Sequence, residues 1–174
     1  EQYGTYSLYL SWLQILTIIT SLYLYYGVFT NGMNNYDTDR DRYVSSMQGL
    51  TLSITGVVFL LFMIAAPTWS DMLGLAPHLI FLMFIEMAVT PALSFWSGRQ
   101  RFEYKYRRLV IVTLAKSIAN PVLGLILVSL AEDKATARIL SVVIVEVCFC
   151  GVIMVYQFIK GKCWFDAKYW KFAL

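Results

Sequence analysis

The sequence predicts an all-α membrane protein, a polytopic helix bundle with five transmembrane helices. Hydrophobic residues make up 59% of the 174-residue chain and charged residues only 14%, whereas a soluble domain has about 45–50% and about 25%, respectively. The mean hydropathy is +0.61, and the apolar residues gather in blocks of roughly 20, the length of a helix that crosses a ~30 Å hydrocarbon core. The net charge of +3 does not indicate nucleic-acid binding, because the basic residues fall in separate links between these blocks.

The first predicted helix begins at about residue 6 and ends near residue 30, because Asn31-Gly32 is a natural helix stop. Gln14 belongs to a stripe of polar residues that recur at three- and four-residue steps, so this helix has one polar face. The second helix follows a charged link, and Pro67 is expected to end it.

Three further helices follow, and the basic stretch between residues 97 and 108 is expected to be the loop between the third and the fourth. Short polar links join the others. The predicted spans cover residues 6–30, 43–66, 77–97, 108–131 and 137–158, in a bundle of residues 1–163 that is followed by an interfacial lead-in, residues 164–174, to a further helix.

Lysine and arginine residues predict the orientation of the bundle. Eleven of them lie in the links after the first, third and fifth helices, and only Lys134 and Arg138 lie on the opposite side. Because cytoplasmic loops carry the excess of basic residues, the side with eleven is expected to face the cytoplasm. The chain would then start outside at Glu1, without an initiator methionine, and we expect it to be a fragment of a longer protein with a preceding span.

Three charged residues fall near the middle of predicted spans. Glu86, Lys116 and Glu146 lie about nine or ten residues into the third, fourth and fifth helices. Thr90 shares a face with Glu86, and Asn120 shares a face with Lys116, at helical spacing. A charge at this depth costs several kcal/mol, so these faces are expected to point at a partner helix or at water.

Three interpretations of these charges remain open. Lys116 could form a structural ion pair with Glu86 or Glu146, could line a hydrated cavity together with them, or could extend to the inner interface. Two acids against one base leave one carboxylate without a basic partner, which would suit proton coupling.

Other motifs point to few functions. Pro91 and Pro121 lie inside predicted helices and favour kinks. The acidic link at residues 37–42 superficially resembles a calcium loop, but it has arginine where the loop requires glycine, so no metal site is expected. His78 is the only histidine and offers no hydrolytic arrangement, so an enzyme is not expected. The three cysteines have no metal-ligand spacing, and Cys148 and Cys150 are expected to be packing residues.

Several stretches resemble one transporter family. They include the opening Glu1-Gln-Tyr-Gly-Thr-Tyr-Ser-Leu8, Gly98-Arg-Gln-Arg-Phe-Glu-Tyr-Lys105, Asn120-Pro-Val-Leu-Gly124 and the closing Tyr169-Trp-Lys-Phe-Ala-Leu174. Together they are similar to the bacterial polysaccharide flippases, the O-antigen and capsule exporters of the multidrug/oligosaccharidyl-lipid/polysaccharide transporter superfamily. The resemblance covers essentially the whole chain but less than half of a family member, so the five helices would be spans two to six of an N-terminal lobe.

The resemblance implies translocation of an undecaprenyl-pyrophosphate-linked oligosaccharide across the bacterial inner membrane by alternating access. It implies a cation-lined cavity, with membrane lipids and the polysaccharide polymerase machinery as further partners. No cofactor is expected, while H⁺ or Na⁺ could be the coupling ion. The candidate cavity residues are Lys116, Asn120, Glu86, Glu146, Thr90 and Gln14.

Three other functions stay open. An ion-coupled multidrug exporter of the same superfamily is favoured by the two carboxylates within the spans. A membrane-embedded transferase or polymerase is disfavoured, because the outer links at residues 68–76 and 132–136 are too short to form an active site. A purely structural subunit would use the buried charges only for packing.

Overall fold

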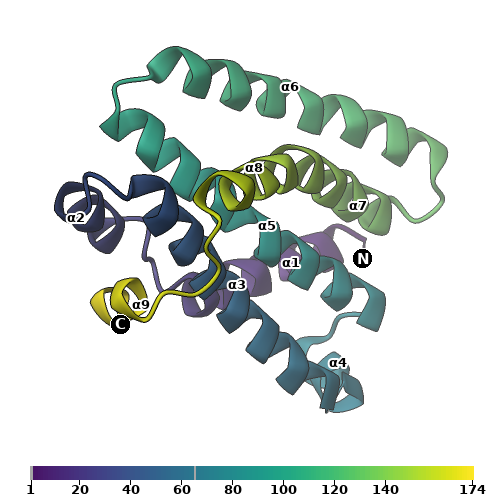
Figure 1. Cartoon of the computed structure of the whole chain (residues 1–174). Coiled ribbons are helices and arrows are strands. Elements are labelled where there is room, and N and C mark those ends of the chain that lie inside the picture. The colour runs from purple at the N-terminus through teal and green to yellow at the C-terminus, as the bar shows by residue number, and fades with distance from the viewer. Residues whose placement is uncertain (1, 65) are drawn as a thin grey trace.

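The computed structural model describes residues 2–64 and 66–174, and within this part of the chain it is all-helical with no β-strand. The predicted all-α class is therefore confirmed. The predicted outer start of the chain at Glu1 lies outside the described residues. In chain order (Figure 1), the elements are α1 (Gln2–Ser21), α2 (Gly27–Asn35), α3 (Arg40–Ile64), α4 (Ala66–Leu73), α5 (Pro77–Phe102), α6 (Tyr106–Leu130), α7 (Lys134–Glu146), the π-helical turn η1 (Val147–Gly151), α8 (Val152–Gly161) and α9 (Ala167–Ala173).

Four helical segments of the described chain are long and apolar enough to cross a membrane. They are α3, α5, α6 and the continuous rod α7–η1–α8, Lys134–Gly161. The chain is therefore a membrane protein. The five predicted spans are not confirmed, because α1 is long enough, at 20 residues, but is not among the segments with sufficient hydropathy.

The continuous helix predicted over residues 6–30 is wrong. It is broken between α1 and α2, where Leu22 and Tyr23 adopt left-handed backbone angles, with φ of 47° and 48°. The break lets Leu24, which is 2% exposed, enter the core together with Phe29. Burial of such side chains stabilises each by about 1.5–3 kcal/mol, which outweighs the local preference for continuing the helix.

The predicted stop at Asn31-Gly32 is also wrong, since both residues lie within α2. Gly32 serves close packing instead. A Cβ at Gly32 would lie only 2.1 Å from the ring of Tyr43, so glycine lets α2 and α3 approach each other. The hydroxyl of Tyr43 then donates a hydrogen bond to the carbonyl oxygen of Val28 at 3.1 Å.

The basic loop predicted between residues 97 and 108 shrinks to a turn of residues 103–105. Arg99 and Arg101 continue α5, and Arg107 and Arg108 begin α6. Arginine is a good helix former, and basic residues in the last turn of α5 complement its dipole. The charges therefore extend the helices beyond the apolar core rather than interrupting them.

The remaining boundaries shift by a few residues. The span predicted at 43–66 is α3, and Pro67 lies within the next helix, α4, rather than ending the span. The span predicted at 137–158 begins three residues earlier, because the side chain of Asp133 accepts hydrogen bonds from the backbone N–H groups of Ala135 and Thr136. The lead-in at 164–174 contains the short helix α9, whose Tyr169 is buried.

Helix α5 is at the centre of the bundle and packs against α1, α3, α7 and α8. One apolar cluster, which includes Ile80 and Met83, lies near its start, and a second, which includes Phe95 and Met47 of α3, lies near its end. Helix α6 packs mainly along α7 and leaves most of its apolar surface exposed, as its place at the edge of the bundle shows (Figure 1).

Candidate functional site

Lys116 and Glu146 form an ion pair between α6 and the end of α7. The Lys116 Nζ lies 2.7 Å from Glu146 Oε1 and 2.8 Å from Oε2, and the two side chains are 19% and 10% exposed. The thiol of Cys150 donates a hydrogen bond to Glu146 Oε2 at 2.9 Å. Lys116 thus pairs with Glu146 rather than with Glu86 or the inner interface, and Cys150 belongs to the site although the sequence indicated only packing.

The backbone of the rod α7–η1–α8 places Cys150 beside Glu146. The π-helical turn η1 begins directly after Glu146 and contains Cys150. A π-turn accommodates one extra residue per turn and often occurs at functional sites. Neither the turn nor the thiol contact had a signal in the sequence, because a π-turn has no strong local residue preference.

Three residues of α6 form the stripe that faces α7. Lys116, Asn120 and Gly124 are spaced by four residues and therefore lie on one side of the helix. At Gly124, a Cβ would lie 2.1 Å from Nη1 of Arg138 on α7, so the absence of a side chain makes room for the guanidinium. The stripe thus sets the rotation of α6 about its own axis and directs Lys116 toward Glu146.

Asn120 contacts Arg138 through its backbone rather than its side chain. Arg138 Nη1 donates to the Asn120 carbonyl oxygen at 3.3 Å. The Asn120 side-chain oxygen is buried and has no hydrogen-bond partner among the described residues. The sequence placed Arg138 at the outer end of the predicted span 137–158, but the early start of α7 at Lys134 places it one turn inside the rod, and the Asp133 cap was the signal that could have found it.

Glu86 occupies a separate position on α5. It is 6% exposed, and its Oε2 accepts a hydrogen bond from the hydroxyl of Tyr9 on α1 at 2.7 Å. No lysine or arginine of the described chain forms an ion pair with it. The hydroxyl of Thr90 donates to the backbone oxygen of Glu86 at 2.8 Å, so it satisfies the helix backbone and not the carboxylate.

Gln14 does not join these residues. Its side chain is exposed on α1 and makes no hydrogen bond within the described chain. The candidate set therefore divides into Lys116 with Glu146 and Asn120 along the α6–α7 contact, Glu86 with Thr90 on α5, and an isolated Gln14.

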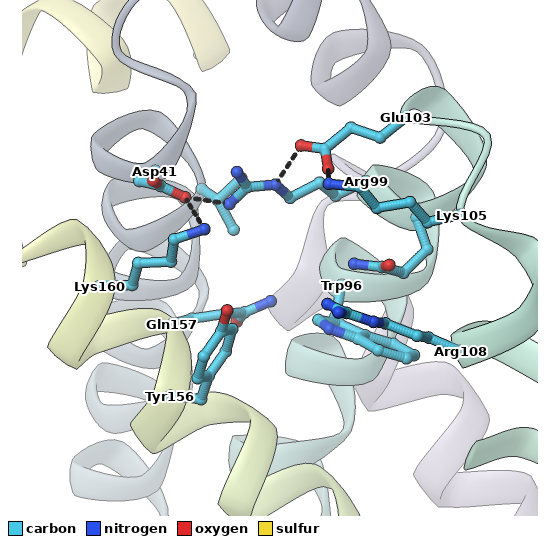
Figure 2. A pocket seen from close by; sticks show the side chains of 11 residues that line it. Asp41, Trp96, Arg99, Glu103, Lys105, Arg108, Tyr156, Gln157 and Lys160 are labelled. Carbon is cyan, nitrogen blue, oxygen red and sulfur yellow. Dashed lines mark hydrogen bonds and ion pairs between the residues drawn. The ribbon is translucent and has the colours of Figure 1, made fainter. Parts of the chain in front are cut away.

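A second polar site, the basic pocket, lies where the ends of α3, α5, α6 and α8 meet (Figure 2). Arg99 of α5 contacts Asp41 of α3, and its Nε lies 2.7 Å from Glu103 Oε1. Lys105 Nζ lies 2.5 Å from Glu103 Oε2, and Lys160 Nζ of α8 lies 3.3 Å from Asp41 Oδ1. The network joins three helices whose residues are far apart in the sequence.

Glu103 is the most strongly perturbed acid of this network. Partial burial alone would raise its pKa, but hydrogen bonds from Lys105 and Arg99, with the charges of both, lower the pKa to about 2. Glu103 therefore stays ionised throughout the physiological range and holds the two bases in place.

The acidic link before α3 contains an ion pair. Asp37 contacts Arg40 as an ion pair. Across the described residues, no group of three or more histidine, cysteine, aspartate or glutamate side chains is arranged to hold a metal ion.

No protein-family model matches the chain, and no curated protein and no solved structure matches it. Function is therefore inferred from the geometry of the buried charges and the basic pocket, together with the resemblance carried by the short stretches described above.

Proposed function

We propose that the protein is a transporter rather than an enzyme, and that it translocates an undecaprenyl-pyrophosphate-linked oligosaccharide across the bacterial inner membrane by alternating access. In this proposal α1 also crosses the membrane, which brings the number of spans to five. The resemblance to polysaccharide flippases supplies the substrate class. The buried ion pair supplies a cation that would meet the substrate's pyrophosphate.

The observation that carries the proposal is the pair of Lys116 and Glu146 near the middle of two apolar helices. Replacing a buried ion pair by apolar side chains is often neutral or stabilising. A pair that serves only stability is therefore disfavoured at this depth, where ionisable residues commonly mark a substrate or ion pathway.

In this proposal, Lys116 exchanges its carboxylate partner for the pyrophosphate of the substrate during transport. A pyrophosphate oxygen can accept a charge-assisted hydrogen bond from the Lys116 ammonium in place of the Glu146 carboxylate. Glu146 would retain the Cys150 thiol as a donor, since that bond does not involve Lys116. Pro121, five residues along α6, weakens the helix near the lysine and would allow the bending that access from two sides requires.

The experiment removes both charges together, so that neither is left unpaired. The double variant K116M/E146Q, reconstituted in liposomes, is expected to move a fluorescent undecaprenyl-pyrophosphate oligosaccharide at least about tenfold more slowly than the native protein, because a charge-assisted hydrogen bond is worth about 1.5–3 kcal/mol. The matched control is Lys171→Ala on α9, where the lysine is exposed.

Equal movement by the double variant would show that Lys116 and Glu146 are packing residues. If the native protein itself does not move the lipid-linked oligosaccharide, the proposal that it is a flippase is wrong. Retained folding of the double variant, checked by its elution as a single species, would separate loss of transport from loss of structure.

Ion-coupled export of a cationic compound is the second candidate, and Glu86 is the observation that favours it. Its carboxylate is buried with a tyrosine hydroxyl and without a paired cation among the described residues. In a bacterial host without its own exporters, the protein would then confer drug resistance that Glu86→Gln abolishes. Resistance that is absent, or unchanged by the substitution, would remove this candidate.

A further inference from the structure

The basic pocket carries more positive charge than its own acids neutralise. Four bases and two acids line it, and both acids already have two cationic partners each. Arg108 lines the pocket from the first turn of α6 and forms no ion pair within the described chain. The surplus of two positive charges beside a cavity of about 40 Å³ favours an anionic ligand.

The start of α6 adds a second argument for an anion. Arg107 and Arg108 lie in its first turn, which contains no acidic residue and has no side-chain cap. Cations at a helix N-terminus are opposed by the helix dipole, whereas an anion there is stabilised by the dipole and by unpaired N–H groups. The arginines of α5 differ, because they lie in its last turn, where the dipole favours them.

Two glutamines of the pocket lack hydrogen-bond donors for their side-chain oxygens. Gln100 and Gln157 both line it, are 6% and 4% exposed, and have side-chain oxygens without a partner among the described residues. A buried unpaired acceptor costs about 1–3 kcal/mol. These oxygens are themselves shielded from the cavity, so a ligand that carries hydroxyl groups next to its negative charge would satisfy them once the amide groups rotate toward it.

The surroundings of the pocket belong to a membrane interface. Trp96 and Tyr156 line it (Figure 2), and such side chains are enriched at the depth of lipid headgroups. Apolar residues exposed on the same helices, Val110 on α6 and Ile159 on α8, provide surface along which acyl chains would lie. A lipid can therefore present its headgroup to the pocket while its chains stay in the bilayer.

We infer that the basic pocket binds the headgroup of an anionic phospholipid with hydroxyl groups next to its phosphate, of the phosphatidylglycerol type. The phosphate lies among Arg108, Lys160 and the start of α6, and the headgroup hydroxyls donate to Gln100 and Gln157. The cavity has room for only a few water molecules, since one water needs at least about 10–15 Å³, so one end of the headgroup displaces them while the rest of it lies at the opening of the pocket. The site is separate from Lys116 and does not depend on the transported substrate.

The test measures lipid binding to the detergent-solubilised protein by native mass spectrometry. Phosphatidylglycerol is expected to bind at least about tenfold more tightly than phosphatidylcholine, and Arg108→Gln should remove most of this preference, as loss of a charge-assisted contact predicts. Arg107→Gln is the matched control, because Arg107 lies on the same turn, is exposed and does not line the pocket. Gln100→Leu should weaken phosphatidylglycerol and leave phosphatidic acid, which lacks the headgroup hydroxyls, unchanged.

Equal effects of the two arginine substitutions, or no preference for phosphatidylglycerol over phosphatidylcholine, would overturn the inference. Competition by inorganic phosphate at the same concentration as the lipid would assign the pocket to a free anion and overturn the lipid source. Because the readout is binding, these outcomes are distinct from failure of the proposed transport, which liposome flipping measures.

Discussion

At the scale of single residues, three buried or partly buried acids of the bundle each have a different kind of partner. Glu146 has a lysine and a thiol, Glu86 has a tyrosine hydroxyl, and Glu103 has two bases. These partners determine what each substitution should do, because removing one partner leaves the other unsatisfied in a low-dielectric setting.

Tyr9→Phe is expected to destabilise the protein by about 1–3 kcal/mol, because Glu86 then loses its one hydrogen-bonding side-chain partner within the described chain. Thermal unfolding in detergent measures the change. Tyr3→Phe is the control, since Tyr3 is 82% exposed. An equal midpoint for the two variants would show that the hydroxyl of Tyr9 does not support Glu86.

Glu103 makes the stability of the folded protein depend on pH. Its pKa is lowered to about 2 in the folded protein, so the stability it contributes is complete above its ordinary pKa of about 4.3 and is lost as the pH falls toward 2. Native protein should therefore exceed Glu103→Gln in stability by about 1–2 kcal/mol near pH 7, allowing for solvent screening. The gap between the unfolding midpoints of the two proteins should narrow as the pH falls from 7 to 3, and a gap independent of pH would contradict this role.

At the scale of elements, two glycines of α3 separate close packing from helix propensity. A Cβ at Gly49 would lie 2.0 Å from the backbone oxygen of Trp164, whereas at Gly56 it would meet nothing within 4 Å. Gly49→Ala is therefore expected to cost about 1–3 kcal/mol through overpacking. Gly56→Ala should be neutral or stabilising by up to about 1 kcal/mol. The midpoints of thermal unfolding of the two variants test this difference. Similar midpoints would refute the close approach of Gly49 to the backbone of Trp164.

The sequence was sufficient for elements whose apolar runs are long and uninterrupted. The helices around Glu86 and Lys116 were predictable, as was the position of these charges along them, because a charge within an apolar run is visible in the sequence. The break after Ser21 was not, since it follows from burial of Leu24 against other helices. The choice of Glu146 as partner was not either, because it depends on the rotation of α6 that Gly124 permits.

At the scale of the whole molecule, the basic pocket and most lysines and arginines lie at one end of the bundle. The charge distribution predicts that this end faces the cytoplasm. With the free and accessible Cys148 and Cys163 replaced by serine, a cysteine introduced at Lys171 should react with a membrane-impermeant maleimide only in inside-out vesicles, and one at Lys134 only in intact cells. The reverse labelling pattern would show that the orientation is opposite to the predicted one and that the basic pocket faces the other leaflet.

The π-turn η1 has a consequence for how the two polar sites are related. Glu146 precedes it, while Gln157 and Lys160 of the basic pocket follow it on the same rod. Each residue of a helix turns the chain by about 100°, so the extra residue of η1 sets the angular phase between the two sites. Converting η1 to an α-turn would rotate α8 relative to Glu146 and withdraw Gln157 from the carbonyl oxygen of Ala92, to which it now donates at 3.2 Å. One local change in helix winding would therefore alter the geometry of both the ion pair and the basic pocket.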